Sequence, residues 1–278
     1  MTDLPDTDKD KQALVYRQRL WTRITHWTWA IALFFLLLSG LQIFNAHPAL
    51  YVGKQSGFDF NNEVLAFGAD SAANGQPAGY ARVLGHRFDT TGVLGLSWEG
   101  GDWQERGFPA WATIPSYQDL ATGRVVHFFF AWIFALALLG WVVGSLVNGH
   151  LKRDLKPSAA DLRNLPRDVL DHVKLRFHHR RDYNTLQKLS YGAVLFIIMP
   201  TIIITGLAMS PTIDSVLPFL ADMLGGRQTA RTIHFIMMLL LVGFFVVHIV
   251  MIFAAGPLNE LRSIITGWYR TDARESAR

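Results

Sequence analysis

The sequence predicts an all-α membrane protein, a four-transmembrane-helix bundle with a large periplasmic loop. Three observations lead to this fold class. Half of the 278 residues are hydrophobic, and the run 232–259 contains 28 residues without Asp, Glu, Lys or Arg. A bilayer crossing needs only ~20 such residues. Lys and Arg are also distributed unevenly between the segments that connect the apolar runs.

The uncharged runs divide the chain into nine segments. Of the 26 Lys and Arg, 19 fall in residues 1–23, 148–188 and 256–278, and such segments stay cytoplasmic. We therefore expect a multi-pass protein of the bacterial inner (cytoplasmic) membrane with both termini cytoplasmic. The predicted segments are a cytoplasmic N-terminal segment (1–23), a first span (24–46), a periplasmic loop (47–122), a second span (123–147), a basic cytoplasmic loop (148–187), a third span (188–209), a short periplasmic turn (210–230), a fourth span (231–255) and a cytoplasmic tail (256–278).

Two of the connections carry further signals. The loop 47–122 holds 11 of the 23 glycines and eight acidic against four basic residues, with weak periodicity. We expect mostly irregular structure there, with short helices or a hairpin, and a loop of that length indicates a function. In the basic loop, Ser158 is expected to cap an amphipathic helix that breaks near Pro166. Pro200 is expected to kink the third span.

The absence of cysteine limits the chemistry. The chain has no Cys, which excludes disulfides, iron–sulfur clusters, thiolate ligation and the covalent haem attachment that requires C-x-x-C-H. Any bound metal must therefore be held by His, Met or carboxylate groups.

Four histidines lie in the predicted spans, at His26, His127, His234 and His248. The last two are 14 residues apart, which is ~21 Å of rise on nearly the same helix face. The alternation of spans places His26 at the depth of His248 and His127 at the depth of His234. Two axial imidazoles at each level are what two haem b groups require, with these four histidines as the iron ligands.

Two glycines match the same depths. Gly40 lies 14 residues after His26, at the level of the His127/His234 pair, and Gly140 lies 13 residues after His127, at the level of the other pair. A flat porphyrin needs helix positions without side chains, so both glycines are predicted to pack against haem. Ordinary helix packing is the alternative for each glycine.

The histidines also admit a haem-free interpretation. A single histidine in a span often makes an interhelical hydrogen bond or relays protons. A transporter that uses them in this way is expected to show inverted repeats, which the sequence does not display.

A resemblance to a known family rests on three stretches, residues 38–51, 225–234 and 255–267. The bacterial di-haem cytochrome b family labelled thiosulfate reductase cytochrome b subunit resembles this chain over nearly its whole length, and the formate dehydrogenase gamma subunit and the cytochrome b of nickel–iron hydrogenase are more distantly similar. In that wider family the ligands come from helices one, two and four, at positions that match the four histidines.

The resemblance also implies a quinone site. In the formate dehydrogenase relatives a Tyr-Asn-x-x-Gln-Lys motif opens the third span beside the cytoplasmic haem, and here it is residues 183–188. Asn184 and Gln187 are therefore candidates for binding quinone, an exchangeable substrate. The alternative for Asn184 is a helix cap.

These observations together predict the electron-transfer subunit of a quinone-reactive membrane oxidoreductase complex. Such a subunit passes electrons between a periplasmic redox partner docked on 47–122 and the quinone pool. The resemblance implies that this partner is a molybdopterin oxidoreductase. The alternative is a stand-alone cytochrome b that oxidises a small reductant such as superoxide, with quinone as acceptor. Lipid is the expected surroundings, and no nucleic acid is expected among the partners.

Overall fold

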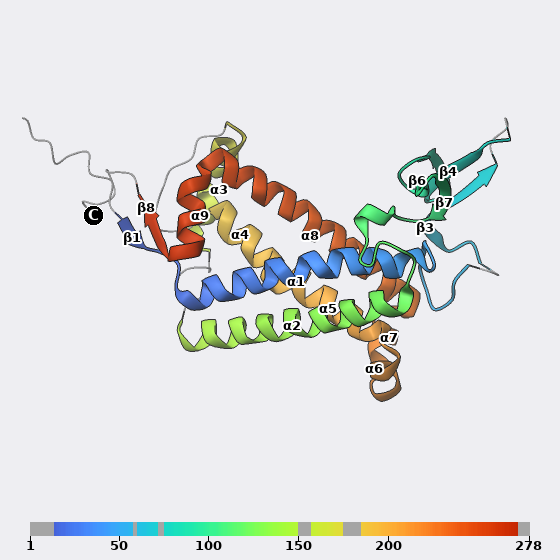
Figure 1. Cartoon of the computed structure of the whole chain (residues 1–278). Helices are drawn as coiled ribbons and strands as arrows, with labels where there is room; N and C mark the ends of the chain where they lie inside the picture. Colours follow the sequence, from blue (N-terminus) through green and yellow to red (C-terminus); the bar gives the residue numbers. More distant parts are fainter. Residues whose placement is uncertain (1–13, 58–59, 72–74, 150–156, 175–184, 272–278) are drawn as a thin grey trace, which may run out of the picture. The chain divides into compact units, whose positions relative to one another are not determined.

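A computed structural model describes residues 14–57, 60–71, 75–149, 157–174 and 185–271. The protein is mostly helical, and four of its helical stretches are long and apolar enough to cross a membrane. This confirms the predicted number of candidate spans (Figure 1). The four stretches are α1 (Leu20–Asn45), α2 (Leu120–Val147), the third stretch Thr185–Met209, and α8 (Arg227–Ala255).

The third stretch is not a uniform α-helix. It consists of α4 (Thr185–Ala193), a π-helical segment η3 (Val194–Ile198) and α5 (Met199–Met209). Pro200 is the second residue after the π-helical segment. A proline has no N–H and its ring crowds the carbonyl four residues earlier, and a π-bulge is one way for a helix to accommodate this. The predicted irregularity at Pro200 is therefore a change of helix type.

Shorter elements fill the connections. Several helix ends carry recognisable signals: Asp119 accepts hydrogen bonds from the Thr122 N–H and hydroxyl at the start of α2, and Gly256 takes a positive φ of 110° just after α8. The shorter elements are β1 (Leu14–Tyr16), β2 (Ala49–Tyr51), β3 (Glu63–Ser71), β4 (Pro77–Val83), β5 (His86–Asp89), β6 (Gly95–Glu99), β7 (Asp102–Arg106), η1 (Ala110–Ala112), α3 (Ala159–Val173), α6 (Pro211–Val216), α7 (Phe219–Met223), α9 (Pro257–Thr266) and β8 (Trp268–Arg270).

The chain forms two compact units, and the division falls within each of the four long helical stretches. The first unit comprises residues 1–27, 137–197 and 241–278, and the second comprises 28–136 and 198–240. In the first unit the ring of Trp141 on α2 contacts Phe196, and Tyr191 on α4 contacts Phe244 on α8.

In the second unit α1 and α2 pack against each other. Phe35 and Phe130 stack with ring centroids 4.3 Å apart, and the Gly123 backbone lies against the Gln42 side chain. Since Phe35 precedes Gln42 whereas Phe130 follows Gly123, the two helices are antiparallel in this unit.

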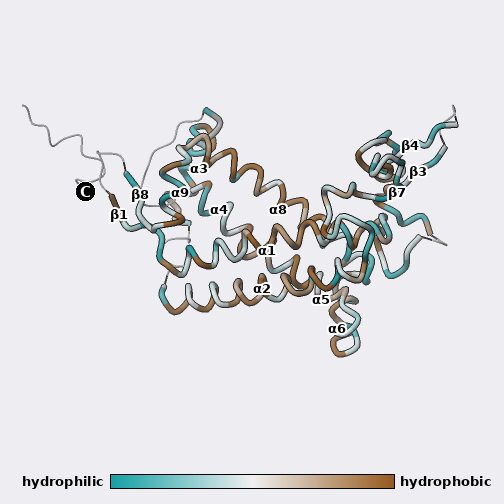
Figure 2. The backbone as a smooth tube through the Cα atoms, in the orientation of Figure 1, coloured by the Kyte–Doolittle hydropathy of each residue, from teal (hydrophilic) through white to brown (hydrophobic). Residues whose placement is uncertain are grey.

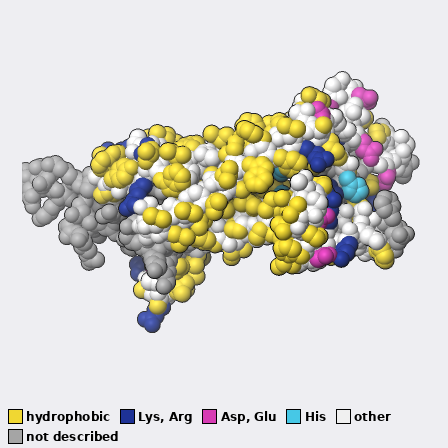
Figure 3. Space-filling view, turned by 90° about the horizontal axis from the view of Figure 1, so that it is seen from below, with side chains coloured by type: hydrophobic (Ala, Val, Ile, Leu, Met, Phe, Trp, Pro, Cys, Tyr) yellow, Lys and Arg dark blue, Asp and Glu magenta, His cyan; other side chains and the backbone are white. Residues whose placement is uncertain are grey.

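The long helices expose many apolar side chains. Figure 2 shows that hydrophobic residues concentrate along these helices, and Figure 3 shows hydrophobic side chains over much of the helical surface. Phe129 on α2 is 61% exposed and Phe253 on α8 is 70% exposed. A contiguous apolar surface of this kind is unfavourable in water and suits a lipid environment.

The loop 47–122 differs from its prediction, because it contains β-structure where the all-α fold class expected little. Strands β2, β3, β4 and β5 form an antiparallel sheet in that order, and β6 pairs with β7 as a hairpin. Gly68 on β3 is directly opposite Tyr80 on β4, and the Tyr80 ring occupies the space that a Gly68 side chain would take. Glycine weakens a strand signal in sequence, but a cross-strand aromatic ring compensates for the missing side chain.

An aromatic cluster joins this sheet to the helices of the second unit. Phe44 at the end of α1 contacts Phe67 on β3, Phe108, and Phe235 on α8, with ring centroids 5.0 to 5.8 Å apart. Leu50 on β2 belongs to the same buried cluster. The loop is therefore anchored on helix ends by apolar contacts, which are the main source of stability in a protein interior.

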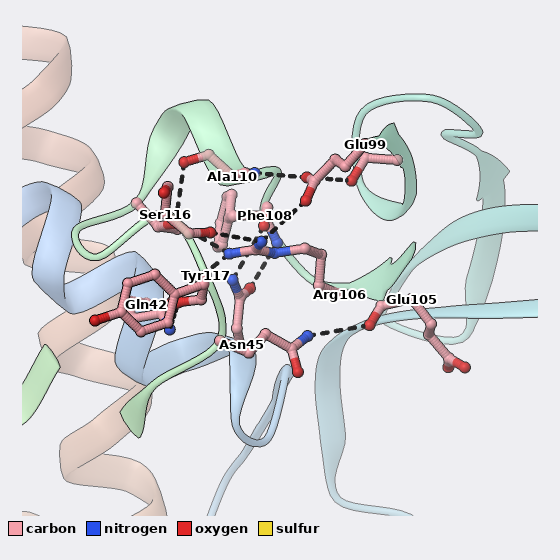
Figure 4. A network of polar contacts seen from close by, with 12 residues as sticks. Gln42, Asn45, Glu99, Glu105, Arg106, Phe108, Ala110, Ser116 and Tyr117 are labelled. Carbon is pink, nitrogen blue, oxygen red and sulfur yellow. Dashed lines mark hydrogen bonds and ion pairs between the residues drawn. The ribbon is translucent and has the colours of Figure 1, made fainter. Parts of the chain in front are cut away.

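A buried arginine adds a polar anchor (Figure 4). The side chain of Arg106 at the end of β7 is 3% exposed, and its guanidinium donates to Glu99 Oε2 at 3.1 Å, to Gln42 Oε1 at 3.2 Å and to Thr113 Oγ1 at 3.0 Å. Asn45 exchanges hydrogen bonds with the backbone N–H and carbonyl of Phe108. The planar guanidinium thereby fixes the β6–β7 hairpin onto the last turns of α1.

Helix α3 shows the predicted cap but not the predicted break. The Ser158 hydroxyl accepts from the Asp161 N–H at 3.1 Å, and the Asp161 carboxylate accepts from the Ser158 N–H at 2.8 Å, which is a capping box. The helix continues through Pro166 to Val173, so the expectation of a break there is wrong. Asp161 also binds the Lys188 ammonium at 2.9 Å and so ties α3 to α4.

The Glu99 carboxylate makes stability depend on pH. Burial alone raises its pKa, but hydrogen bonds from the Ala110 N–H, the Ser97 hydroxyl and Arg106 outweigh burial, so the pKa lies below its ordinary value. The stabilisation is therefore complete above the unfolded-state pKa of about 4.3 and is lost as the pH falls through the lowered pKa.

We predict that Glu99→Gln destabilises the protein by about 1–3 kcal/mol at pH 7, the usual cost of losing charge-assisted hydrogen bonds. Thermal unfolding in detergent measures this loss. The difference from the wild type should shrink as the pH falls through the Glu99 pKa, because the wild-type carboxyl then becomes neutral as well. Glu105→Gln, which changes an exposed acceptor on the same hairpin, is the matched control. An equal loss of stability at pH 7 and at a pH below the Glu99 pKa would contradict the role given to the ionised Glu99 carboxylate.

Candidate haem-binding histidine pairs

The structure brings His127 and His234 together in the second unit. His127 lies one turn into the apolar part of α2, and His234 lies two turns into α8. Their ring centroids are 6.3 Å apart and the ring planes are inclined by 59°. The residues that the sequence predicts to share one level therefore form a facing pair.

The structure also brings His26 and His248 together, in the first unit. Their ring centroids are likewise 6.3 Å apart, with planes inclined by 52°. His248 stacks on Phe244 one turn earlier in α8, at 5.6 Å and 14°, while His26 contacts the edge of Trp27. Helix α8 supplies one imidazole to each pair.

The spacing within each pair fits a shared iron. An imidazole nitrogen binds a metal at about 2 Å, and the ring centroid lies about 1 Å behind that nitrogen, so two axial imidazoles on one iron have centroids roughly 6 Å apart. In the part of the chain that the structure describes, no cluster of three or more His, Cys, Asp or Glu side chains suits a metal ion. A pair of imidazoles with no third protein ligand suits a porphyrin, which supplies the other four nitrogens itself.

Buried hydroxyl groups contact the His127/His234 pair. Ser39 Oγ on α1 lies 3.1 Å from His127 Nδ1, and Thr205 Oγ1 on α5 lies 3.0 Å from His234 Nδ1. Both hydroxyl side chains are fully buried. These two contacts are not evident from the sequence. Its only signal for them is a hydroxyl residue followed by glycine in each of two spans.

These contacts bear on which ring nitrogen of each histidine carries the proton. The Ser39 hydroxyl donates its only proton to the Phe35 carbonyl, and the Thr205 hydroxyl donates its own to the Thr201 carbonyl at 2.8 Å. Each hydroxyl oxygen can then only accept from the histidine. With the hydroxyl proton given to its own helix, the tautomer that satisfies both groups carries its proton on Nδ1 and leaves the lone pair of Nε2 for a metal.

The glycines lie in two different settings. A Cβ on Gly40 would come within 3.2 Å of His127 Cε1, and one on Gly206 within 3.4 Å of His234 Cε1. Gly140 instead faces the Trp21 indole, which a Cβ there would approach to 3.3 Å, and Gly144 faces the same indole. The structure thus places Gly40 at the pair where the sequence puts it. The packing of Gly40 and Gly140 against haem stays a prediction.

The candidate quinone residues are only partly described. Asn184 lies outside the described residues. Gln187 lies in the first turn of α4, beside Lys188 and its ion pair with Asp161. The quinone site therefore also stays a prediction.

Comparison with known proteins places this arrangement in a family. The family model described as prokaryotic cytochrome b561 matches residues 17–267, which includes all four histidines. The chain belongs to the prokaryotic cytochrome b561 family. It is accordingly a multi-pass membrane cytochrome b, and membership implies haem b binding. The match supports the cytochrome b resemblance, while the thiosulfate reductase type stays a prediction.

A curated relative has a similar extent. The putative protein-methionine-sulfoxide reductase subunit YedZ1 of Azospira oryzae is 27% identical over 236 residues, which is 84% of this chain and 87% of the relative. Its name describes the Azospira oryzae protein as a subunit of a reductase.

We predict that Gly40→Val and Gly140→Val have different effects. Valine at position 40 collides with the His127 ring and should weaken haem retention at the His127/His234 pair. Valine at position 140 presses on Trp21 and should leave the spectrum of that pair unchanged. Reduced-minus-oxidised difference spectra of the purified variants measure both effects. Equal loss in both variants, or loss in Gly140→Val alone, would show that the Gly40 contact does not matter.

Proposed function

We propose that this chain is a di-haem electron-transfer subunit, in which His26 and His248 hold one haem b and His127 and His234 hold the other. The observation that carries the proposal is the presence of two imidazole pairs with the same 6.3 Å centroid spacing. A proton-relay role gives no reason for the equal spacing or for the protonated Nδ1 atoms at one pair.

The chain contributes three things to electron transfer. The histidines hold and space the two centres, 14 residues apart along α8, which is about 21 Å of helical rise. The Ser39 and Thr205 hydroxyls orient the imidazoles of one centre. The apolar helices exclude water from both centres. Haem supplies the one-electron chemistry, and its surroundings set the potential.

The proposed docking surface for the redox partner is the β-structure of the 47–122 loop. Trp98 and Trp103 form an edge-to-face pair on the β6–β7 hairpin, and the nearby Trp111 is 80% exposed. Exposed tryptophans are enriched at protein interfaces. Acidic residues outnumber basic ones in this loop, so a partner with a basic face fits it.

The name of the Azospira oryzae relative supports a reductase as the redox partner. A chain resembling a protein-methionine-sulfoxide reductase subunit would deliver electrons to a catalytic subunit that reduces oxidised methionine. A molybdopterin cofactor in that partner belongs to the same proposal. In this arrangement the loop is periplasmic and both ends of the chain are cytoplasmic, as the Lys and Arg distribution favours.

Quinone is the proposed exchange substrate on the cytoplasmic side, near Asn184 and Gln187 and next to the His26/His248 haem. The stand-alone alternative, oxidation of a small reductant such as superoxide, needs no protein partner. The exposed tryptophan pair and the reductase relative both favour the subunit function.

We predict two haem b per chain by pyridine haemochrome analysis, and one in either His26→Ala or His127→Ala. Rapid mixing with a reduced quinone analogue then tests the path of the electrons. His127→Ala should retain quinol-reducible haem, because its remaining centre is next to the proposed quinone site. His26→Ala should lose rapid reduction, since its remaining centre is at the other level.

His86→Ala, an exposed histidine on β5, is the control and should keep both haems and the wild-type rate. One haem or none in the wild type would overturn the di-haem assignment. Rapid reduction in His26→Ala would overturn the quinone position.

A further inference from the structure

We propose that Ser39 and Thr205 are positioning residues that lower the reduction potential of the His127/His234 haem. This inference rests on the proposed function, because it requires that pair to hold an iron. It concerns two residues on helices that supply no ligand to this centre, α1 and α5.

The two hydroxyls hold their histidines in the same way. Each imidazole Nδ1 lies within hydrogen-bond distance of a hydroxyl oxygen, at 3.1 Å for His127 and 3.0 Å for His234. Each imidazole also makes a hydrogen bond with the backbone carbonyl of the residue three positions before that hydroxyl residue, Leu36 for His127 and Ile202 for His234. A carbonyl can only accept a hydrogen bond. Each imidazole therefore acts as a donor toward α1 or α5, and its contact with the hydroxyl is made by Nδ1.

A glycine follows the hydroxyl residue on both helices. The absent side chains of Gly40 and Gly206 let each ring edge approach the helix backbone, with the Cε1 atoms 3.2 and 3.4 Å from the position of a Cβ. We call Ser39-Gly40 and Thr205-Gly206 the hydroxyl–glycine pairs. In each of them the hydroxyl determines the proton position and the glycine allows the close approach.

His26, in the other pair, lacks this arrangement among the described residues. Nδ1 of His26 is buried and has no hydrogen-bond partner among the described residues. The neighbouring Thr25 hydroxyl bonds the Trp21 and Thr22 carbonyls of its own helix. The two centres thus differ in the groups that accept from their ligands, although their ring spacings are the same.

The consequence for the iron follows from the charge on its ligand. An imidazole that donates Nδ1–H to an acceptor becomes a more basic ligand. A more basic ligand stabilises the ferric state over the ferrous state, because the ferric ion carries one more positive charge. Neither Ser39 nor Thr205 is exposed, so water cannot replace the lost acceptor in a variant. Removing either hydroxyl should therefore favour the reduced state.

Thr205→Val is the decisive variant, because valine keeps nearly the same shape without the hydroxyl. We expect Thr205→Val and Ser39→Ala each to shift the ferric-to-ferrous balance of one haem about tenfold toward ferrous. For a one-electron couple this is a rise of about 59 mV in the midpoint potential. A spectroelectrochemical titration of purified holoprotein resolves the two haems, and the low-spin EPR signal of the same haem should change as well.

Two further variants separate positioning from simple packing. Thr205→Ser retains the hydroxyl and should keep the wild-type potential. Thr25→Val removes a buried hydroxyl with the same intrahelical bonds and should leave the potential of the His127/His234 haem unchanged. A loss of haem content without a change in potential would indicate packing alone and would overturn the proposal.

An unchanged potential and EPR signal in a haem-replete Thr205→Val protein would also overturn it. If Ser39→Ala fails to retain haem, the comparison of Thr205→Val with Thr205→Ser still decides. A wild-type protein that lacks two titrating haems would instead show that the proposed function fails, and this is measured before any variant is compared.

Discussion

The pairing of imidazoles within an apolar helical environment is the interaction on which the rest depends. A histidine in a membrane span is costly unless its polar atoms are satisfied. At the His127/His234 pair, Nδ1 is satisfied by a neighbouring helix, while Nε2 stays available to a metal. The two helices that carry a pair therefore have to bring their imidazoles to the same height, and Gly40 and Gly206 leave room for the rings of one pair.

Much of the architecture can be predicted from the sequence because it depends on one-dimensional spacing. Uncharged runs predict the spans, and 14 residues of helix fix the height between His234 and His248. The contacts of Ser39 and Thr205 are a different kind of information. They depend on the rotation of α1 and α5 about their axes, which hydropathy does not determine. Thr205 is especially hard to predict, since its helical stretch contains no histidine that marks a site.

The loop shows why local patterns fail outside the membrane. Its two longest strands, β3 and β4, contain Gly68 and Gly79, so period-two alternation is weak there. The Tyr80 ring restores the missing contact, but it comes from the next strand and is not evident from β3 alone. The buried guanidinium of Arg106 likewise joins residues more than 60 positions apart in sequence. Tertiary contacts of this kind make the loop a structured platform where local sequence suggests an irregular connection.

The pairing of β1 with β8 has a consequence for biosynthesis. Leu14–Tyr16 and Trp268–Arg270 are the first and last strands that the structure describes, and they align antiparallel, with the Arg17 guanidinium over the Tyr269 ring. A ribosome releases the first strand long before its partner exists. This pairing can therefore form only after residues 268–270 have been synthesised, and a chain that stops before them lacks it.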